Sequence, residues 1–170
     1  MLIEFESYIK DKFPYLLEEK SILCCSGGVD SIVLFYLMLS VSKNFVVAHC
    51  NFKLRGSESD GDQYFVSDLC KENSIKFYAK SFNVKKINAN SNKSTQMIAR
   101  DLRYDFFEQL SLDLKIKHIL TAHHLNDSLE GFIINISRGS GLDGLTGIPI
   151  ENNKIKRPLI GFEKSKIINY

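Results

Sequence analysis

The chain has 170 residues, which is long enough for one domain with a sizeable hydrophobic core. Its hydrophobic content of 44% and charged content of 25% are ordinary for a globular protein, and its net charge of +2 does not by itself indicate nucleic-acid binding. The sequence lacks a Cys-x-x-Cys pair, a signal-peptide pattern and an apolar run of membrane-spanning length, so we expect a cytoplasmic protein without a zinc ribbon, a redox motif or a membrane span.

Apolar spacing predicts helices and strands that alternate along the chain. In chain order we expect a helix over 2–18, a strand over 21–25, a helix over 30–41, a strand over 45–49, a helix over 59–72, a strand over 75–79, a loop over 83–94, a helix capped by Ser94 and ending near 112, a strand over 119–121, a helix over 127–138, strands over 148–150 and 155–160 around a turn, and a helix from 164 to 170. This alternation predicts an α/β fold in one domain over residues 1–170. We expect a parallel sheet of about five strands with helices on both faces.

A short polar turn separates the first predicted strand from the helix that follows it. Its residues are Ser26, Gly27, Gly28, Val29, Asp30 and Ser31. Unpaired backbone N–H groups and the helix dipole favour an anion there, and glycine lets a phosphate approach closely. Asp30 could cap the helix or help hold a metal ion on a phosphate. The plainer alternative is an ordinary glycine turn; a Walker A loop is excluded because no Gly-Lys-Ser/Thr follows.

Basic residues gather in two other predicted segments. His49 and Arg55 follow the second strand, at the same sheet edge as the glycine turn, and Arg55 could bind phosphate bidentately. Arg100 and Arg103 lie three residues apart on one face of a predicted helix, a pattern that suits phosphate or carboxylate binding. The alternative in both cases is a solvated basic surface.

The predicted fourth strand leads into a segment that carries His123 and two carboxylates, Asp127 and Glu130. The carboxylates lie three residues apart and could bind a cationic amine or Mg²⁺, or accept a proton from an attacking amine. Asp127 could equally be a simple N-terminal helix charge. The G-x-G-x-x-G match over 139–144 follows a helix rather than a strand, so we expect a loop closing over the site instead of a dinucleotide fingerprint.

Together, these motifs resemble those of the tRNA(Ile)-lysidine synthase family. The glycine turn resembles the signature of PP-loop ATP pyrophosphatases, whose fold is the Rossmann-like fold of the adenine nucleotide alpha hydrolases. The other family motifs follow in order as HCNFKLR, ARDLRY, HHLNDSLE, RGSGLDGL and RPLI, and the set spans residues 21–160.

The resemblance implies an ATP-dependent ligase that uses Mg²⁺. In this chemistry the C2 oxygen of the wobble cytidine, in the CAU anticodon of isoleucine tRNA, attacks the α phosphate of ATP, and free L-lysine then displaces AMP to give lysidine. The implied ATP-binding residues are Ser26, Gly27, Gly28, Val29, Asp30, Ser31, His49, Arg55, Arg100 and His123. The implied catalytic residues are Asp30, Arg103, Asp127 and Glu130, with lysine bound by Asp127 and Glu130 and Mg²⁺ by Asp30.

Three positions depart from the family pattern. Phe52 stands where many members have a second His, Asn126 replaces the first Asp of a common pair, and Gly131 replaces a Thr. No metal or proton role is therefore carried over to Phe52, and no role that needs both carboxylates is carried over to residues 126–127. The family continues beyond the equivalent of residue 170, so we expect a truncated catalytic domain without the C-terminal tRNA-binding parts.

Two alternative functions stay open. A PP-loop tRNA thiolase would need a catalytic cysteine, and Cys50 at the end of the second strand is the one candidate. An ATP- or RNA-binding fragment without turnover would keep the fold and lose the reaction. The sequence does not indicate an oligomeric state.

Overall fold

The computed structural model describes residues 1–88, 93–137, 139 and 147–170. Its elements are α1 (Leu2–Lys12), η1 (Pro14–Leu17), β1 (Ser21–Cys24), α2 (Val29–Val41), β2 (Phe45–Asn51), α3 (Ser57–Glu72), β3 (Phe77–Ser81), α4 (Val84–Asn88), α5 (Thr95–Leu114), β4 (His118–Leu120), α6 (Leu125–Ser137), β5 (Glu151–Asn152), β6 (Ile155–Lys156) and α7 (Lys164–Ile168). Within these described ranges, no helix has both the length and the apolar character needed to cross a membrane.

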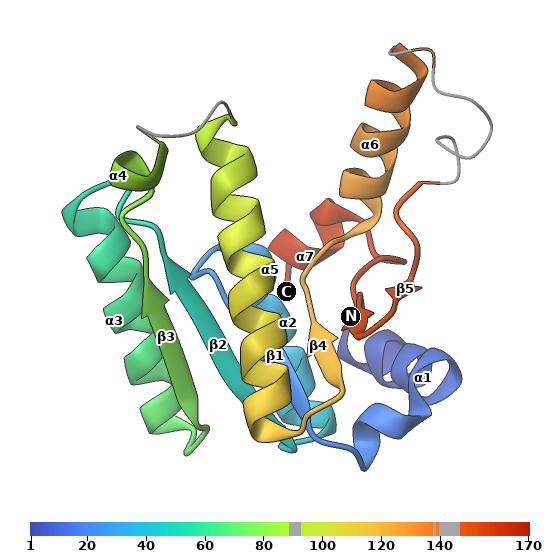
Figure 1. The fold of residues 1–170 in the computed structure, drawn as a ribbon. Coiled ribbons are helices and arrows are strands. Elements are labelled where there is room, and N and C mark those ends of the chain that lie inside the picture. The colour runs from blue at the N-terminus through green and yellow to red at the C-terminus, as the bar shows by residue number, and fades with distance from the viewer. Residues whose placement is uncertain (89–92, 138, 140–146) are drawn as a thin grey trace.

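The sheet has six strands in the order β3-β2-β1-β4-β6-β5 (Figure 1). Neighbouring strands pair in parallel from β3 to β6, and β5 pairs antiparallel to β6. This arrangement confirms the predicted α/β fold. It has one strand more than the roughly five expected, because residues 151–156 form a hairpin. The carboxyl ends of β1, β2 and β4 meet at one edge, and the glycine turn follows β1 at that edge.

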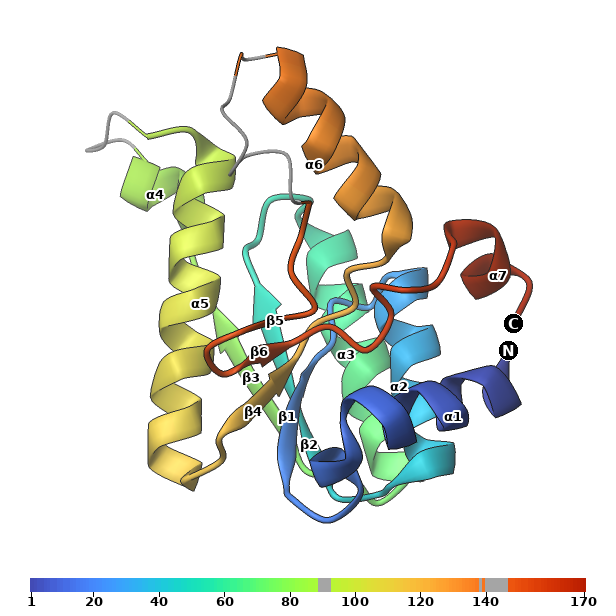
Figure 2. The same cartoon turned by 90° about the vertical axis from the view of Figure 1, so that its right-hand side faces the viewer.

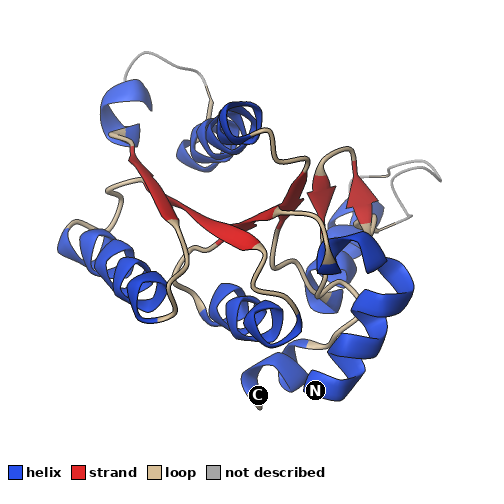
Figure 3. Cartoon of the chain, turned by 90° about the horizontal axis from the view of Figure 1, so that it is seen from below, coloured by secondary structure: helices blue, strands red, loops and turns tan. Residues whose placement is uncertain are grey.

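Helices cover both faces of the sheet (Figure 3), and a hydrophobic core lies between the helices and the sheet on each face. On one face α1, α2, α3 and α7 pack over Leu23 and Val47. On the other face α5 places Phe107 against Ile22 and Val46. Successive strand residues point to opposite faces, so a strand covered on both sides is apolar throughout. This explains why β1 is apolar after Ser21, its first residue.

Two predictions are wrong at identifiable residues, one of a helix and one of a loop. The helix expected over 2–18 ends at Lys12 and a 3-10 turn follows, because Pro14 lacks the N–H that a continuing helix needs. The loop expected over 83–94 begins with α4, because the buried side chain of Val84 packs against Ile98 of α5. Ser94 does cap α5 as predicted, since its hydroxyl accepts a hydrogen bond from the N–H of Met97.

The strands expected over 148–150 and 155–160 are displaced. Glu151 pairs with Lys156 and Asn152 with Ile155, which leaves a two-residue turn at 153–154. Asn153 has a φ of +51°, a conformation that such tight turns require. After Lys156 the chain turns away from the sheet instead of continuing as a strand.

Candidate active site

The turn between β1 and α2 takes a conformation that glycine makes possible. Gly27 has a φ of +89°, which side chains of L-residues rarely allow, and a Cβ atom at this position would lie 3.3 Å from the Cβ of Asp62. Gly28 is the N-cap of α2, so the first N–H groups of that helix have no partner within it. The turn therefore presents hydrogen-bond donors at the positive end of the helix dipole.

Ser31 holds this turn together. Its buried hydroxyl donates a hydrogen bond to the carbonyl oxygen of Gly28 at 2.8 Å and accepts one from the N–H of Ser26 at 3.1 Å. The N–H of Gly28 in turn donates to the hydroxyl oxygen of Ser26 at 3.3 Å. The Ser31 hydroxyl thus stabilises the conformation of the turn.

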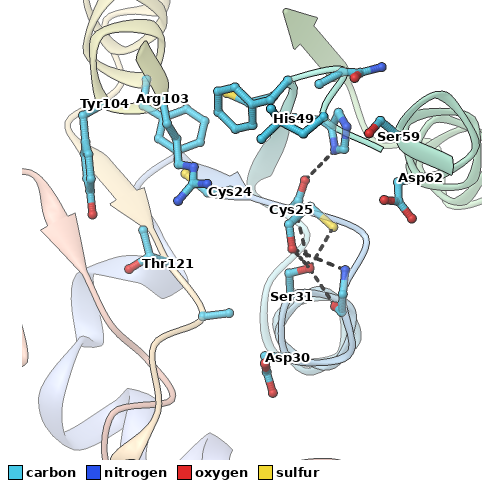
Figure 4. Close-up of a pocket in the computed structure, with 18 of the residues that line it drawn as sticks. Cys24, Cys25, Asp30, Ser31, His49, Ser59, Asp62, Arg103, Tyr104 and Thr121 are labelled. Atoms are coloured by element: carbon cyan, nitrogen blue, oxygen red, sulfur yellow. Dashed lines mark hydrogen bonds between the residues drawn. The ribbon is translucent and has the colours of Figure 1, made fainter. Parts of the chain in front are cut away.

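A pocket of about 420 Å³ opens beside the turn at the carboxyl edge of the sheet (Figure 4). The turn forms one wall, and Arg103 and Tyr104 reach in from α5 on the opposite side. The predicted site residues that line the pocket are Ser26, Gly28, Asp30, Ser31, His49, Arg55, Arg103 and His123. The fold therefore brings together four motifs that are far apart in the sequence.

Five predicted site residues are not among the described residues that line this pocket: Gly27, Val29, Arg100, Asp127 and Glu130. Asp127 accepts a hydrogen bond from the N–H of His124 at 2.8 Å, which is the behaviour of a carboxylate at a helix N-terminus. Glu130 is exposed on α6, a helix that rises away from the sheet edge (Figure 1). The expected loop over the site falls largely on residues 138 and 140–146, outside the described residues.

His49 is a neutral hydrogen-bond acceptor in the pocket wall. Its side chain is 2% exposed, and its Nδ1 lies 2.9 Å from the carbonyl oxygen of Cys25. A carbonyl only accepts, so Nδ1 carries the proton and Nε2 keeps its lone pair, which has no partner in the described structure. Burial lowers the pKa of His49 and outweighs the effects of Cys25 and of the Asp62 charge, which both raise it. His49 therefore carries no charge at pH 7, and its Nε2 is a buried acceptor in the pocket wall.

The two arginines of the pocket are held differently. Arg55 forms an exposed ion pair with Asp62, with Nη2 and Oδ2 2.6 Å apart. The guanidinium of Arg103 lies 5.4 Å from the ring centroid of Phe52, in a cation–π contact. Phe52, one of the departures from the family pattern, is therefore a platform for Arg103. Among the described residues Arg103 has no ion-pair partner, which leaves its charge available to a ligand.

Asp30 contacts two basic side chains at the mouth of the pocket. Its Oδ1 accepts a hydrogen bond from Nζ of Lys164, and Nε2 of His124 lies 3.8 Å from the same oxygen. Within the described residues, no three His, Cys, Asp or Glu side chains are grouped to hold a metal ion. Mg²⁺ is commonly held by one or two carboxylates together with substrate phosphates, so Asp30 beside a phosphate-type turn fits this ion.

Two hydrogen bonds between the start of α6 and the segment that leads into α7 hold Lys164 in position. The N–H of Lys164 donates to Oδ1 of Asn126 at 2.9 Å, and the N–H of Leu125 donates to the carbonyl oxygen of Phe162 at 3.0 Å. Asn126, another departure from the family pattern, therefore caps the start of α7. The link joins the start of α6 to the segment that carries Lys164.

The thiols of the pocket are neutral at pH 7. Burial raises the pKa of Cys50 to about 12, although Arg103 and Lys80 act to lower it. Burial likewise raises the pKa of Cys24, the neighbouring thiol in the pocket lining. A neutral thiol is a poor nucleophile.

Comparison with known protein families matches residues 2–170 to the PP-loop domain. The chain belongs to the PP-loop domain family. This membership agrees with the position of the glycine turn and with the parallel sheet.

Curated proteins similar to this PP-loop domain include tRNA(Ile)-lysidine synthases from Bacteroides thetaiotaomicron, 37% identical over 163 residues, and from Chlorobaculum tepidum, 40% identical over 153 residues. These matches cover 96% and 88% of the chain but 38% and 46% of the two relatives. The chain therefore spans less than half the length of either protein.

Solved structures with a similar fold include a U34-tRNA thiolase from Methanococcus maripaludis, with a TM-score of 0.78, 20% identity, and coverage of 99% of this chain and 62% of that chain. An NH3-dependent NAD synthetase from Campylobacter jejuni has a TM-score of 0.67, 14% identity, and coverage of 99% and 69%. At these identities the likeness concerns the PP-loop fold alone.

Sequence reasoning missed two charged side chains of the PP-loop site. Asp62 lines the pocket and pairs with Arg55, but it lies in a helix whose acidic residues look like a solvated face. Lys164 reaches Asp30 only because the chain returns to the sheet edge after β6. A basic residue that starts a helix soon after the RPLI motif is the one signal that could have indicated Lys164.

Proposed function

We propose that this PP-loop domain ligates lysine, using ATP, to C2 of the wobble cytidine in the CAU anticodon of isoleucine tRNA. The observation that carries the proposal is a pocket in which a phosphate-type turn faces Arg103, an arginine with no ion-pair partner among the described residues. The names of the similar curated proteins support the choice of RNA and amino acid. Because the chain spans less than half of these relatives, the reaction is assigned to it as a hypothesis to be tested.

In the proposed first step, the C2 carbonyl oxygen of the cytidine attacks the α phosphorus of ATP. An O–P bond forms while the bond to the bridging β oxygen breaks, so that pyrophosphate leaves and the cytidine is adenylated. Backbone N–H groups of residues 29–31, at the start of α2, and the guanidinium of Arg103 stabilise the charge on the phosphate oxygens. Asp30 would hold Mg²⁺, which supplies further charge neutralisation when it is bound. Arg55, Arg100, His123 and the acceptor of His49 complete the proposed ATP site.

In the proposed second step, the ε-amine of lysine attacks C2 of the adenylated cytidine. A C–N bond forms, the C–O bond breaks, and AMP leaves with that oxygen. The amine must first lose a proton, and Asp127 and Glu130 are the carboxylates proposed to bind the ammonium group and accept it. The cytidine must also leave its base stack for C2 to be reached.

The experiment is ATP-dependent incorporation of labelled lysine into an isoleucine tRNA transcript with a CAU anticodon. A transcript with uridine at the wobble position is the control, and we expect incorporation into the cytidine transcript only. Asp127→Asn and Glu130→Gln should abolish incorporation without changing the melting temperature. Glu72→Gln, an exposed substitution at the far end of α3, should leave incorporation intact.

Equal labelling of both transcripts would contradict the proposal. ATP binding without incorporation into either transcript would instead favour a nucleotide-binding domain without turnover. Full activity in the Asp127 and Glu130 variants would remove their proposed role while leaving the reaction in place.

A further inference from the structure

Arg157 is a buried cation that has no counter-charge among the described residues. It follows β6 directly, its side chain is 7% exposed, and its Nη1 donates a hydrogen bond to the carbonyl oxygen of Pro149 at 2.7 Å. Its Nε has no hydrogen-bond partner, and no carboxylate of the described residues forms an ion pair with it. A guanidinium stays charged in proteins, so burying it is strongly unfavourable unless an anion compensates for it.

Lys156, the residue before Arg157, is also a buried cation, but it is paired with a carboxylate. Lys156 is 8% exposed, and its ammonium group contacts the carboxylate of Glu151 and, at 3.1 Å, the carbonyl oxygen of Asn153. The chain thus supplies a carboxylate for one of two adjacent buried cations. For Arg157, the described residues supply only the neutral carbonyl of Pro149.

The ionisable side chains that influence Arg157 make this contrast sharper, because in the described part of the chain they are Tyr104 and Arg100 and neither is a carboxylate. Burial chiefly lowers the pKa of Arg157, Tyr104 acts to raise it, and the nearby charge of Arg100 lowers it further. Burial also lowers the pKa of His123, and the charge of Arg157 is the next cause. The charges of Arg157 and Arg100 repel each other, and an anion bound beside them would relieve that repulsion.

Arg157 follows β6 and is not among the described residues that line the pocket, but the neighbouring strand β4 leads into that lining. The N–H of Thr121 donates to the carbonyl oxygen of Lys156 at 3.0 Å, which places Arg157 beside the carboxyl end of β4. Thr121 and His123 at that end line the pocket. Figure 2 shows β6 next to β4, with α5 at their side. The PP-loop turn that is proposed for ATP phosphates follows β1, two strands from β6.

We propose that Arg157 binds a phosphodiester group of the RNA strand next to the nucleotide that enters the pocket, beside the Arg100 and His123 of the proposed ATP site. The inference rests on the proposed RNA substrate. Phosphate is the anion that the planar guanidinium fits best, through two parallel hydrogen bonds. Arg100 also stacks on the ring of Tyr104 at 5.0 Å, and such a pairing of cation and aromatic ring suits single-stranded RNA.

The test compares Arg157→Gln and Arg157→Lys with Lys43→Gln, which removes an exposed charge at the opposite edge of the sheet. Fluorescence anisotropy measures binding of an RNA hairpin with a CAU loop at several salt concentrations, and calorimetry measures ATP binding. We expect Arg157→Gln to weaken RNA binding about tenfold and to reduce the slope of log K against log salt by about one. ATP affinity and melting temperature should stay near those of the unsubstituted chain. Arg157→Lys should keep the slope of log K against log salt and lose part of the RNA affinity. Lysine keeps the positive charge but lacks the planar guanidinium that donates two parallel hydrogen bonds.

Three outcomes would overturn the assignment. A lower melting temperature of Arg157→Gln with an unchanged salt slope would mean that Arg157 stabilises the fold through its hydrogen bond to Pro149 and does not bind RNA. An equal loss of ATP affinity would place the anion site on ATP rather than on RNA. If Arg157→Gln does not fold, unchanged RNA affinity in Arg157→Lys would decide against the proposal. Lack of RNA binding by the unsubstituted chain would count against the proposed function itself, which separates that failure from this one.

Discussion

Replacing Gly27 with alanine tests the turn that precedes α2. Gly27 has a φ of +89°, and left-handed backbone costs an L-residue roughly 1–2 kcal/mol. The added Cβ would lie 3.3 Å from the Cβ of Asp62, so that side chain must shift and its ion pair with Arg55 must loosen. We expect the folded state to lose about 2 kcal/mol. For a chain of this size, that loss lowers the melting temperature by about 4–8 °C.

The assay is thermal unfolding of the Gly27→Ala variant, followed by calorimetric titration with ATP. Gly61→Ala is the matched control, because Gly61 lies in α3 with nothing within 4 Å of an added Cβ. That control should raise stability by about 0.5–1 kcal/mol, the usual gain of alanine over glycine in a helix. We expect Gly27→Ala to weaken ATP binding at least about tenfold, a loss of about 1.4 kcal/mol. Unchanged melting and unchanged ATP affinity in Gly27→Ala would refute the reasoning about this turn.

Three further substitutions test other parts of the site. Lys164→Met removes the ammonium group that shares the Asp30 carboxylate, so half-maximal ATP binding should need less Mg²⁺; a titration that shows a higher requirement contradicts this. His49→Asn should flatten the fall in melting temperature between about pH 7.5 and 5.5. The pKa of His49 is lowered in the folded state, so the unfolded chain binds the proton first as the pH decreases, and the folded state loses stability. Equal slopes of melting temperature against pH in the variant and the unsubstituted chain would exclude this effect. Cys50→Ser should keep lysine incorporation, because burial holds that thiol neutral, whereas a large loss would favour thiolation.

The sequence predicted the centre of the fold because local patterns determine it. The run around Ile22 is apolar throughout, the glycine turn follows it, and a long apolar helix comes next, so strand, turn and helix could be placed together. Errors arose where one residue overrides its surroundings, as Pro14 does in the first helix. The polar stretch after β3 was expected to be a loop because the packing of Val84 against α5 leaves no periodic signal.

The site was predictable to the extent that its motifs lie at the carboxyl ends of neighbouring strands. His49 and Arg103 line the pocket as expected, since β2 and α5 bring them to the same edge as the turn. The positions of Lys164 and Arg157 depend on how β6 pairs with β4. A strand of two residues is too short for its pairing partner to be predicted from the sequence. The neutral state of His49 depends on burial, which sequence spacing does not reveal.

The hydrogen bonds between the starts of α6 and α7 couple the positions of these two helices. The side chain of Asn126 holds the N–H of Lys164, so a tilt of α6 is transmitted to the base of that lysine. Its ammonium group rests on Asp30, at the opposite end of the same linkage. We therefore expect that a ligand which displaces the start of α6 also shifts the lysine that contacts Asp30, so that contacts made on α6 are coupled to the phosphate turn.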